Sequence, residues 1–170
     1  MKVQVFKTWN RVHSSFWFLP AAMASGAMVL AFATVALDTP VTDWLTLNWG
    51  VTFTGGAEGA SSLLGAIAGS MITIAGVVFS MTLVALSLAS SQLGPRLLRS
   101  FMRDTKTQMV LGTFVATFLY CLLVLRTIRH AEETLFVPHL SVALGVLLAV
   151  VSVGVLIYFI HHVSVSIQAN

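Results

Sequence analysis

The stretch that decides the fold is the uncharged run "GAIAGSMITIAGVVFSMTLVALSLASSQLGP", residues 65–95, which contains no proline before Pro95. It is apolar enough to cross a bilayer, where backbone polar groups must be satisfied within the segment, so it is expected to be helical. At 1.5 Å per residue, about 30 residues span about 45 Å, well beyond a hydrocarbon core of about 30 Å. The run therefore predicts a long transmembrane helix that tilts or projects from the membrane.

Three further apolar segments accompany this one. The expected spans cover about residues 16–37, 61–93, 109–125 and 137–160. Each is near or above the roughly 17 to 25 residues that cross a bilayer as helix. The first is longer than the hydrophobic part of a signal peptide and is expected to stay uncleaved. The fold class predicted is an all-α integral membrane protein, with residues 1–170 forming a single transmembrane domain.

Composition supports a membrane protein and argues against a soluble one. The chain is 57% hydrophobic and 9% charged, against about 25% charged residues in soluble domains. Its mean hydropathy is +0.92 and its sequence pI is about 9.5. The nine Lys and Arg residues form no broad basic face and no nucleic-acid-binding motif, so no nucleic-acid partner is expected.

The distribution of basic residues predicts the topology. Seven Lys and Arg residues lie before the first span or between the second and third: Lys2, Lys7, Arg11, Arg96, Arg99, Arg103 and Lys106. Only Arg126 and Arg129 lie on the other side. The positive-inside rule therefore places both termini and the 94–107 loop in the cytoplasm.

The second span has a face of small and hydroxylated residues at helical spacing. Its members are Ser62, Gly65, Gly69, Thr73, Gly76, Ser80 and Ser87, joined by Ala66, Leu83 and Ser90. The opposite face carries large side chains, among them Leu64, Met71 and Val78. Small residues allow two helices to approach closely, whereas hydroxyls on one face can line a wet path. Both interpretations stay open at this point.

Two connecting segments also carry predictions. Arg96, Arg99, Arg103 and Lys106 recur at helical spacing with apolar neighbours, which predicts a short amphipathic helix on the inner membrane surface. It would contact anionic lipid headgroups or, in an oligomer, attract anions to an inner vestibule. The loop from 38 to 61 is expected to be irregular and to follow the membrane interface. Glu58 near its end is either a helix-start acid or a cation site at a pore mouth.

No catalytic or cofactor-binding pattern is present. The sequence lacks G-x-S-x-G, H-E-x-x-H and Walker motifs, and the spans contain no Asp, Glu, Lys or Arg away from their ends. The single cysteine, Cys121, gives no metal or redox pair, and histidines such as His139 and His161 lie at span ends. The chain is expected to be no enzyme and to hold no cofactor or metal.

The runs "FTGGAEGASSLLGAIAGSMITIAGVVFSMTLVALSLASSQLGPRLLRSFMRD", "LGTFVATFLYCLLVLRTIR", "FVPHLSV" and "GVLIYFIHHVSVSIQ" cover much of the chain. They resemble a domain-of-unknown-function family of predicted bacterial membrane proteins. The resemblance implies four N-terminal spans in a bacterial inner membrane and, in most members, a soluble C-terminal domain, which would follow Asn170. It implies no activity or catalytic residues.

Two functional hypotheses follow. In the first, the protein is a channel-like homo-oligomer with the second span at its centre, and bulky residues at Gly76 or Ser80 block flux without breaking the assembly. In the second, it is a non-catalytic structural or accessory subunit of a larger membrane complex, and the same changes break assembly.

Overall fold

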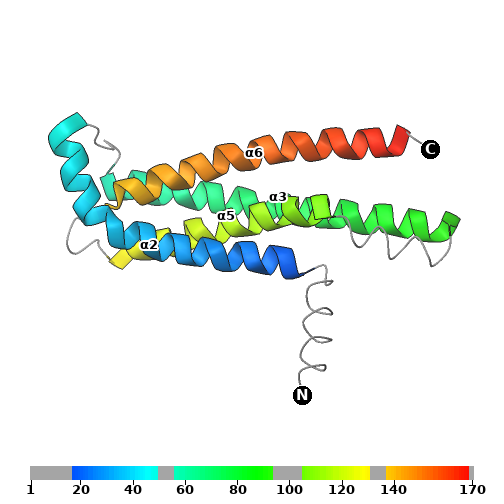
Figure 1. Ribbon diagram of the computed structural model, residues 1–170, viewed down its shortest axis with the longest axis horizontal. Coiled ribbons are helices and arrows are strands. Elements are labelled where there is room, and N and C mark those ends of the chain that lie inside the picture. Colours follow the sequence, from blue (N-terminus) through cyan, green and yellow to red (C-terminus); the bar gives the residue numbers. More distant parts are fainter. Residues whose placement is uncertain (1–16, 50–55, 94–104, 131–136, 169–170) are drawn as a thin grey trace, which may run out of the picture.

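The computed structural model describes residues 17–49, 56–93, 105–130 and 137–168. Within them the chain forms four helices: α2 (Phe18–Trp49), α3 (Gly56–Leu93), α5 (Thr105–His130) and α6 (His139–Gln168). The parts long and apolar enough to cross a membrane are Phe18–Asp38, Gly56–Val84, Thr105–Ile128 and His139–His161. The described chain is thus an all-α membrane protein with four candidate spans (Figure 1), as the sequence predicts.

The helices extend beyond the predicted spans, and one expectation is wrong. The segment after residue 38 is not an irregular loop, because α2 continues through it to Trp49 and α3 already begins at Gly56. Pro40 has no N–H for a helical hydrogen bond and its ring crowds the preceding turn. It therefore bends α2, and the helix continues beyond it. Figure 1 shows this part of α2 turning away from the rest of the helix.

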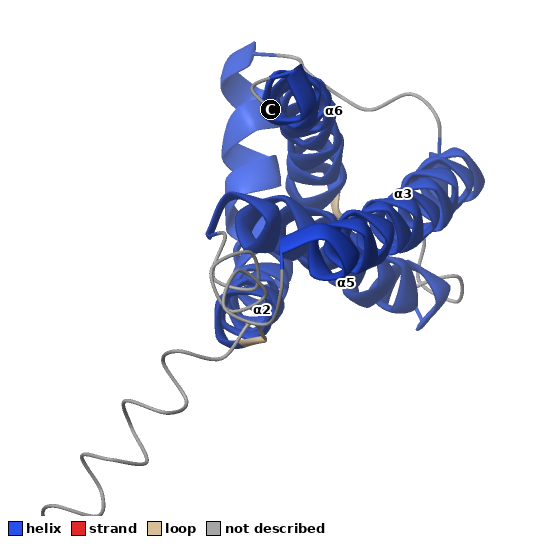
Figure 2. Cartoon of the chain, turned by 90° about the vertical axis from the view of Figure 1, so that its right-hand side faces the viewer, coloured by secondary structure: helices blue, strands red, loops and turns tan. Residues whose placement is uncertain are grey.

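Helix α5 is the centre of the bundle. It packs against α2, α3 and α6, whereas α2 and α3 have no extensive contact with each other in the described part of the chain. Viewed end-on, α5 lies between the other three helices (Figure 2). In the apolar part of α5 that could span the membrane 44% of residues are buried, against 22% in the corresponding part of each of the other three helices. The core therefore forms around α5, and α2, α3 and α6 each leave one face exposed.

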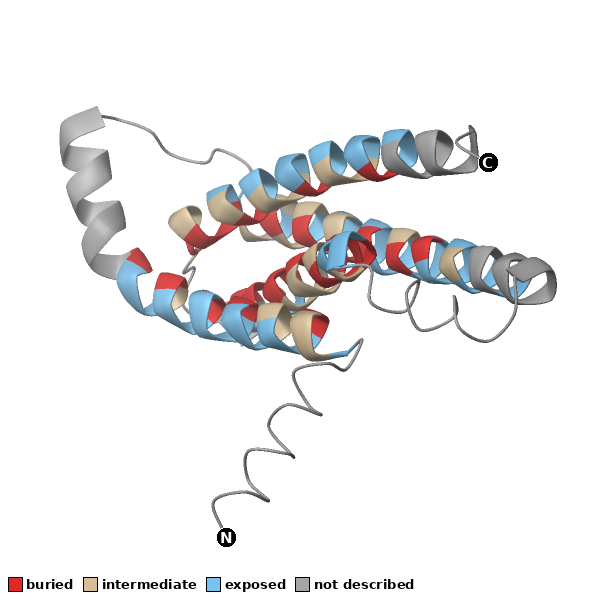
Figure 3. Ribbon diagram, turned by 45° about the vertical axis from the view of Figure 1, so that its right-hand side comes forward, coloured by how far each residue is buried: buried red, intermediate tan, exposed pale blue. Residues whose placement is uncertain are grey.

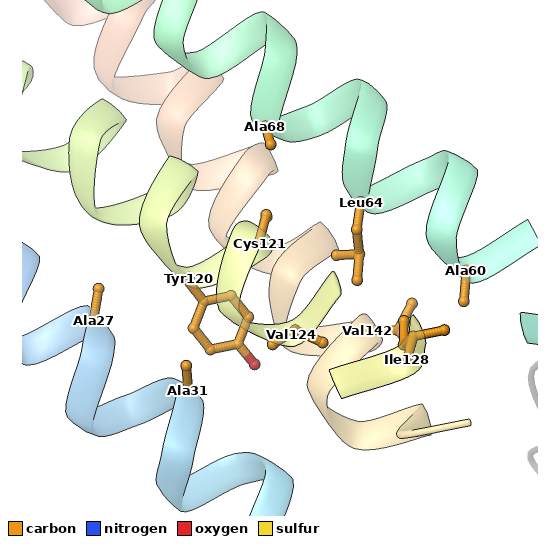
Figure 4. Packing of buried hydrophobic residues seen from close by; sticks show 10 residues of the cluster. All are labelled: Ala27, Ala31, Ala60, Leu64, Ala68, Tyr120, Cys121, Val124, Ile128 and Val142. Atoms are coloured by element: carbon orange, nitrogen blue, oxygen red, sulfur yellow. The ribbon is translucent and has the colours of Figure 1, made fainter. Parts of the chain in front are cut away.

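The core consists of two clusters along α5. The first joins α2, α3, α5 and α6 around Tyr120, Cys121 and Leu64 (Figure 4). The second joins α3, α5 and α6 around Met71, Phe114 and Phe159. Buried residues line the inward faces of the helices, and exposed ones cover the outside (Figure 3). Lipid tails are as apolar as these side chains, so packing rather than water exclusion holds such a bundle together.

Two glycines allow close helix contacts inside the bundle. A Cβ atom at Gly112 of α5 would lie 2.5 Å from Met23 Sδ and 3.3 Å from Pro20 Cα, both on α2. A Cβ atom at Gly145 of α6 would lie 2.8 Å from Leu64 Cδ2 on α3. These glycines, rather than those of the predicted small-residue face, bring the helices of this chain together.

Candidate functional site

A buried polar cluster joins three helices where α6 begins. It consists of Thr34 and Asp38 from α2, Tyr120 from α5 and Ser141 from α6. Asp38, Tyr120 and Ser141 are fully buried, and Thr34 is 7% exposed. Buried polar groups in an apolar setting are costly unless they are hydrogen-bonded, so their partners decide what the cluster does.

Asp38 caps the N-terminus of α6 from another helix. Its Oδ1 accepts a hydrogen bond from the backbone N–H of Leu140 at 3.1 Å. Its Oδ2 accepts two, from the N–H of Ser141 at 2.9 Å and from the Ser141 hydroxyl at 2.7 Å. A side-chain oxygen at an N-cap normally satisfies such first-turn donors, and a carboxylate there also faces the positive end of the helix dipole.

The sequence around the start of α6 explains why the cap comes from α2. The Pro138 carbonyl accepts the N–H of Val142 at 3.0 Å, so Pro138 occupies the N-cap position. Proline has no side-chain acceptor, and the first-turn N–H groups of a helix have no partner within it. Asp38 supplies that acceptor, and in doing so it fixes α2 against α6.

Tyr120 extends the cluster to α5. Its hydroxyl donates to the Ser141 carbonyl at 3.0 Å and lies 3.1 Å from Thr34 Oγ1. The Thr34 hydroxyl donates to the Ala31 carbonyl at 3.1 Å. Both hydroxyls thus have a carbonyl acceptor, and either can be the donor in the contact between them. Figure 4 shows the Tyr120 ring beside Ala31, whose small side chain leaves room for it.

The cluster is suited to holding helices together, not to moving protons along a chain of side chains. Between Tyr120 and Ser141 the link ends on a backbone carbonyl, which has no proton to pass on. Among the described residues, no group of three or more His, Cys, Asp or Glu side chains could hold a metal ion. The geometry therefore assigns the cluster a positioning role at the junction of α2, α5 and α6.

Sequence reasoning missed this cluster because it placed Asp38 in the expected loop from 38 to 61. A usable signal was present at the start of the fourth span, "VPHLSV", which offers no side-chain acceptor before its first turn. Such a helix start needs an acceptor from elsewhere. The acid at the end of the first span was one candidate at the expected membrane boundary.

A second polar contact joins α5 to α6 within the membrane. Ser152 donates to the carbonyl of Leu148 at 2.8 Å, and its oxygen lies 3.0 Å from Thr117 Oγ1. Since the Ser152 proton is used by that carbonyl, Thr117 is the donor between the two hydroxyls. Thr117 is 1% exposed and Ser152 is fully buried.

We expect the Thr117–Ser152 contact to stabilise the bundle by roughly 0.6 kcal/mol, and by no more than about 2 kcal/mol, as for other hydrogen bonds between membrane helices. A double-mutant cycle with Thr117→Val and Ser152→Ala, followed by SDS-induced unfolding in mixed micelles, measures this coupling. Additive effects of the two changes would show that the hydroxyls do not interact. Thr113→Val is a suitable control, since that hydroxyl donates to Met109 of its own helix.

The small-residue face predicted on the second span lies on the outside of α3. Its described members are exposed except Gly65, which is half-buried; the exposed ones are Ser62, Ala66, Gly69, Thr73, Gly76, Ser80, Leu83 and Ser87. The core side of α3 is formed by Ala60, Leu64, Ala68, Met71, Ala75 and Val78. No side chain of the described chain would meet a Cβ atom within 4 Å at Gly65, Gly69 or Gly76.

The sequence comparisons place the chain in a family. Residues 13–170 match the model of a family described as "Predicted membrane protein (DUF2254)". The chain belongs to this family. It is 37% identical over 165 residues to uncharacterized proteins of Mycobacterium bovis and of two Mycobacterium tuberculosis strains, and the match covers 94% of this chain. It spans 30% of the length of these relatives. No solved structure matches.

The predicted basic surface of this DUF2254 chain lies mostly outside the described residues. Arg96, Arg99 and Arg103 fall in the range 94–104, of which the structure describes nothing. Lys106 is exposed in the first turn of α5, so the last residue of the predicted amphipathic helix belongs to a membrane-spanning helix instead. Glu58 is exposed in the first turn of α3, in agreement with its interpretation as a helix-start acid.

Proposed function

We propose that this chain is the membrane domain of a channel-like homo-oligomer in which α3 helices from several copies meet at the centre. In this proposal it is not an enzyme, and it lies in a bacterial inner membrane with both termini cytoplasmic. The observation that carries the proposal is the exposure of the small-residue face of α3, opposite the side that packs in the core.

The glycines of this face support contact with another helix. A glycine inside a helix costs about 0.5 to 1 kcal/mol relative to alanine, because it loses more backbone freedom. Gly112 and Gly145 offset that cost with close contacts inside the chain. Gly69 and Gly76 have no such contact with the described residues, and close approach of a helix from outside would provide one.

The exposed face of α6 offers a comparison within the same molecule. It carries large apolar side chains suited to lipid, namely Val146, Leu147, Val150, Val151, Val153, Ile157 and Ile160. Among them lies Gly154, an exposed glycine at which an added Cβ atom would meet no described atom within 4 Å. The exposed side of α3 also carries large apolar side chains, such as Ile72, Val77 and Met81. What distinguishes it from the exposed face of α6 is the recurrence of small residues from Ser62 to Ser80.

A second candidate function is supported by the hydroxyls of α3. Ser70 donates to the Ala66 carbonyl at 2.8 Å and Thr73 to the Gly69 carbonyl at 2.8 Å. Of these two, Thr73 belongs to the small-residue face and Ser70 is exposed beside it. Hydroxyls bonded to their own helix need no water. This favours a packed face over a wet path, as in a non-catalytic accessory subunit whose α3 docks on a helix of another protein.

Gly76→Leu is expected to separate these candidates. Native mass spectrometry of the full-length protein in detergent should give an integer multiple of one chain mass, and the variant should give smaller species because the added side chain keeps the α3 helices apart. This replaces the sequence-based expectation of an intact assembly, because Gly76 is open to a neighbouring helix and the Thr73 hydroxyl bonds to its own helix. Ion flux from proteoliposomes should be lost with the assembly. Gly154→Leu, at an exposed glycine of α6, should leave both mass and flux unchanged.

Each other outcome has a defined meaning. A monomeric wild-type protein would overturn self-association. An intact assembly with lost flux would place the α3 face along the conducted path rather than in the helix contact. Co-purification with unrelated subunits, released by Gly76→Leu, would establish the accessory role. An unchanged Gly76→Leu variant would remove α3 from the contact altogether.

A further inference from the structure

The helical segment after the bend of α2 runs across the end of the bundle. Residues 39–49 belong to α2. In Figure 1 they turn away from the long axis that the four spans share, and in the end view of Figure 2 they pass beside the start of α6. A helix with this direction lies nearly in the plane of the membrane when the spans stand across it.

The bend occurs at the level where the spans end. The first candidate span ends at Asp38, the second begins at Gly56, the third ends at Ile128 and the fourth begins at His139. Successive spans run in opposite directions, so these four ends belong to one face of the bundle. The hydrogen bonds that the Asp38 carboxylate accepts from the N–H groups of Leu140 and Ser141 fix the bend beside the start of α6.

The sequence of residues 39–49, "TPVTDWLTLNW", is amphipathic at helical spacing. Thr39, Thr42, Asp43 and Thr46 recur at i, i+3, i+4 and i+7 and share one side of the helix. The other side carries Pro40, Val41, Trp44, Leu45, Leu47 and Trp49, with Asn48 as its one polar member. Tryptophan is enriched at the boundary between headgroups and acyl chains, where its ring is apolar and its N–H is wet.

We propose that residues 39–49 form an interfacial helix whose apolar side enters the headgroup–acyl boundary of the bilayer. The occupant of this side is lipid. The segment contains no Lys or Arg and one acid, so binding needs no anionic headgroups and depends on apolar burial. Three features of residues 39–49 support this assignment: the helix turns across the spans, it begins where the spans end, and its sequence is amphipathic. None of them depends on the self-association proposed above.

Tryptophan quenching tests this assignment in the full-length protein. Variants that keep only Trp44 or only Trp49, with the other tryptophans changed to Phe, are reconstituted into phosphatidylcholine vesicles. Spin labels near the headgroup should remove more of the emission than labels near the chain ends. Leu45→Asp, on the apolar side, should reduce this quenching, and Thr42→Asp, on the polar side, should not.

Three results would overturn the proposal. Emission quenched by aqueous iodide and by neither lipid label would place the segment in water. Emission protected from all three quenchers would place it against protein, either another part of the full-length chain or another subunit. Equal effects of Leu45→Asp and Thr42→Asp would contradict the assigned faces.

Discussion

Asp38→Ala is expected to lower the free energy of unfolding by about 3 kcal/mol. The change leaves the N–H groups of Leu140 and Ser141 and the Ser141 hydroxyl without the acceptor they share. Loss of an N-cap alone costs about 1 kcal/mol, and each buried donor left unsatisfied adds about 1 to 3 kcal/mol unless the site relaxes. SDS-induced unfolding of the full-length protein in mixed micelles measures the difference.

Two further variants show whether the carboxylate acts as the cap. Asp38→Asn keeps one acceptor oxygen and should lose less stability than Asp38→Ala. Glu58→Gln, at an exposed acid in the first turn of α3, should change stability by less than about 0.5 kcal/mol. If Asp38→Ala were as stable as Glu58→Gln, the link between α2 and α6 would not depend on this side chain.

Gly112→Leu is expected to destabilise the bundle by about 2 to 3 kcal/mol, because α2 lies against this glycine. A Cβ atom there would be 2.5 Å from Met23 Sδ and 3.3 Å from the backbone of Pro20. Met23 can move because its side chain is flexible, but Pro20 Cα is part of the helix backbone. A larger side chain must therefore push α5 and α2 apart, and overpacking of this kind costs about 1 to 3 kcal/mol.

The matched control is Gly154→Leu, where none of the residues that the structure describes lies within 4 Å of an added Cβ atom. Its unfolding midpoint in SDS should equal that of the wild type or exceed it, since leucine is a better helix former than glycine. Gly112→Ala should lie between the two, because its single methyl group meets mainly the mobile Met23 sulfur. Equal loss in both leucine variants would indicate a general effect of bulk instead of a specific helix contact.

The spans could be predicted from hydropathy because bilayer thickness sets the minimum length of an apolar helix. Their ends could not, since polar residues beyond the core can continue a helix, as α3 does from Gly56 and α2 does to Trp49. The bend near Pro40 could not be predicted from the sequence pattern either, because a proline inside a helix can bend the helix or end it. The surrounding structure decides between the two.

The two faces of α3 were visible in the sequence, but which face this chain covers was not. In water the buried face of a helix is the apolar one, and polarity reveals it. In lipid the large residues around Met71 are equally suited to the core and to the membrane. The covered face of α3 is set by contacts with its neighbours, such as that of Leu64 with Gly145 of α6, and these depend on the assembled bundle.

The central place of α5 has a consequence for biosynthesis. Helix α5 is the third span in chain order, yet it supplies the main packing surface for both α2 and α3, which have little contact with each other in the described structure. During translation the first two spans enter the bilayer before their shared partner exists. Until α5 has been inserted, α2 and α3 lie in the bilayer as separate helices without a shared packed core. The bundle closes only when the ribosome has released α5, and a nascent chain stalled before Thr105 would hold two helices with no common core.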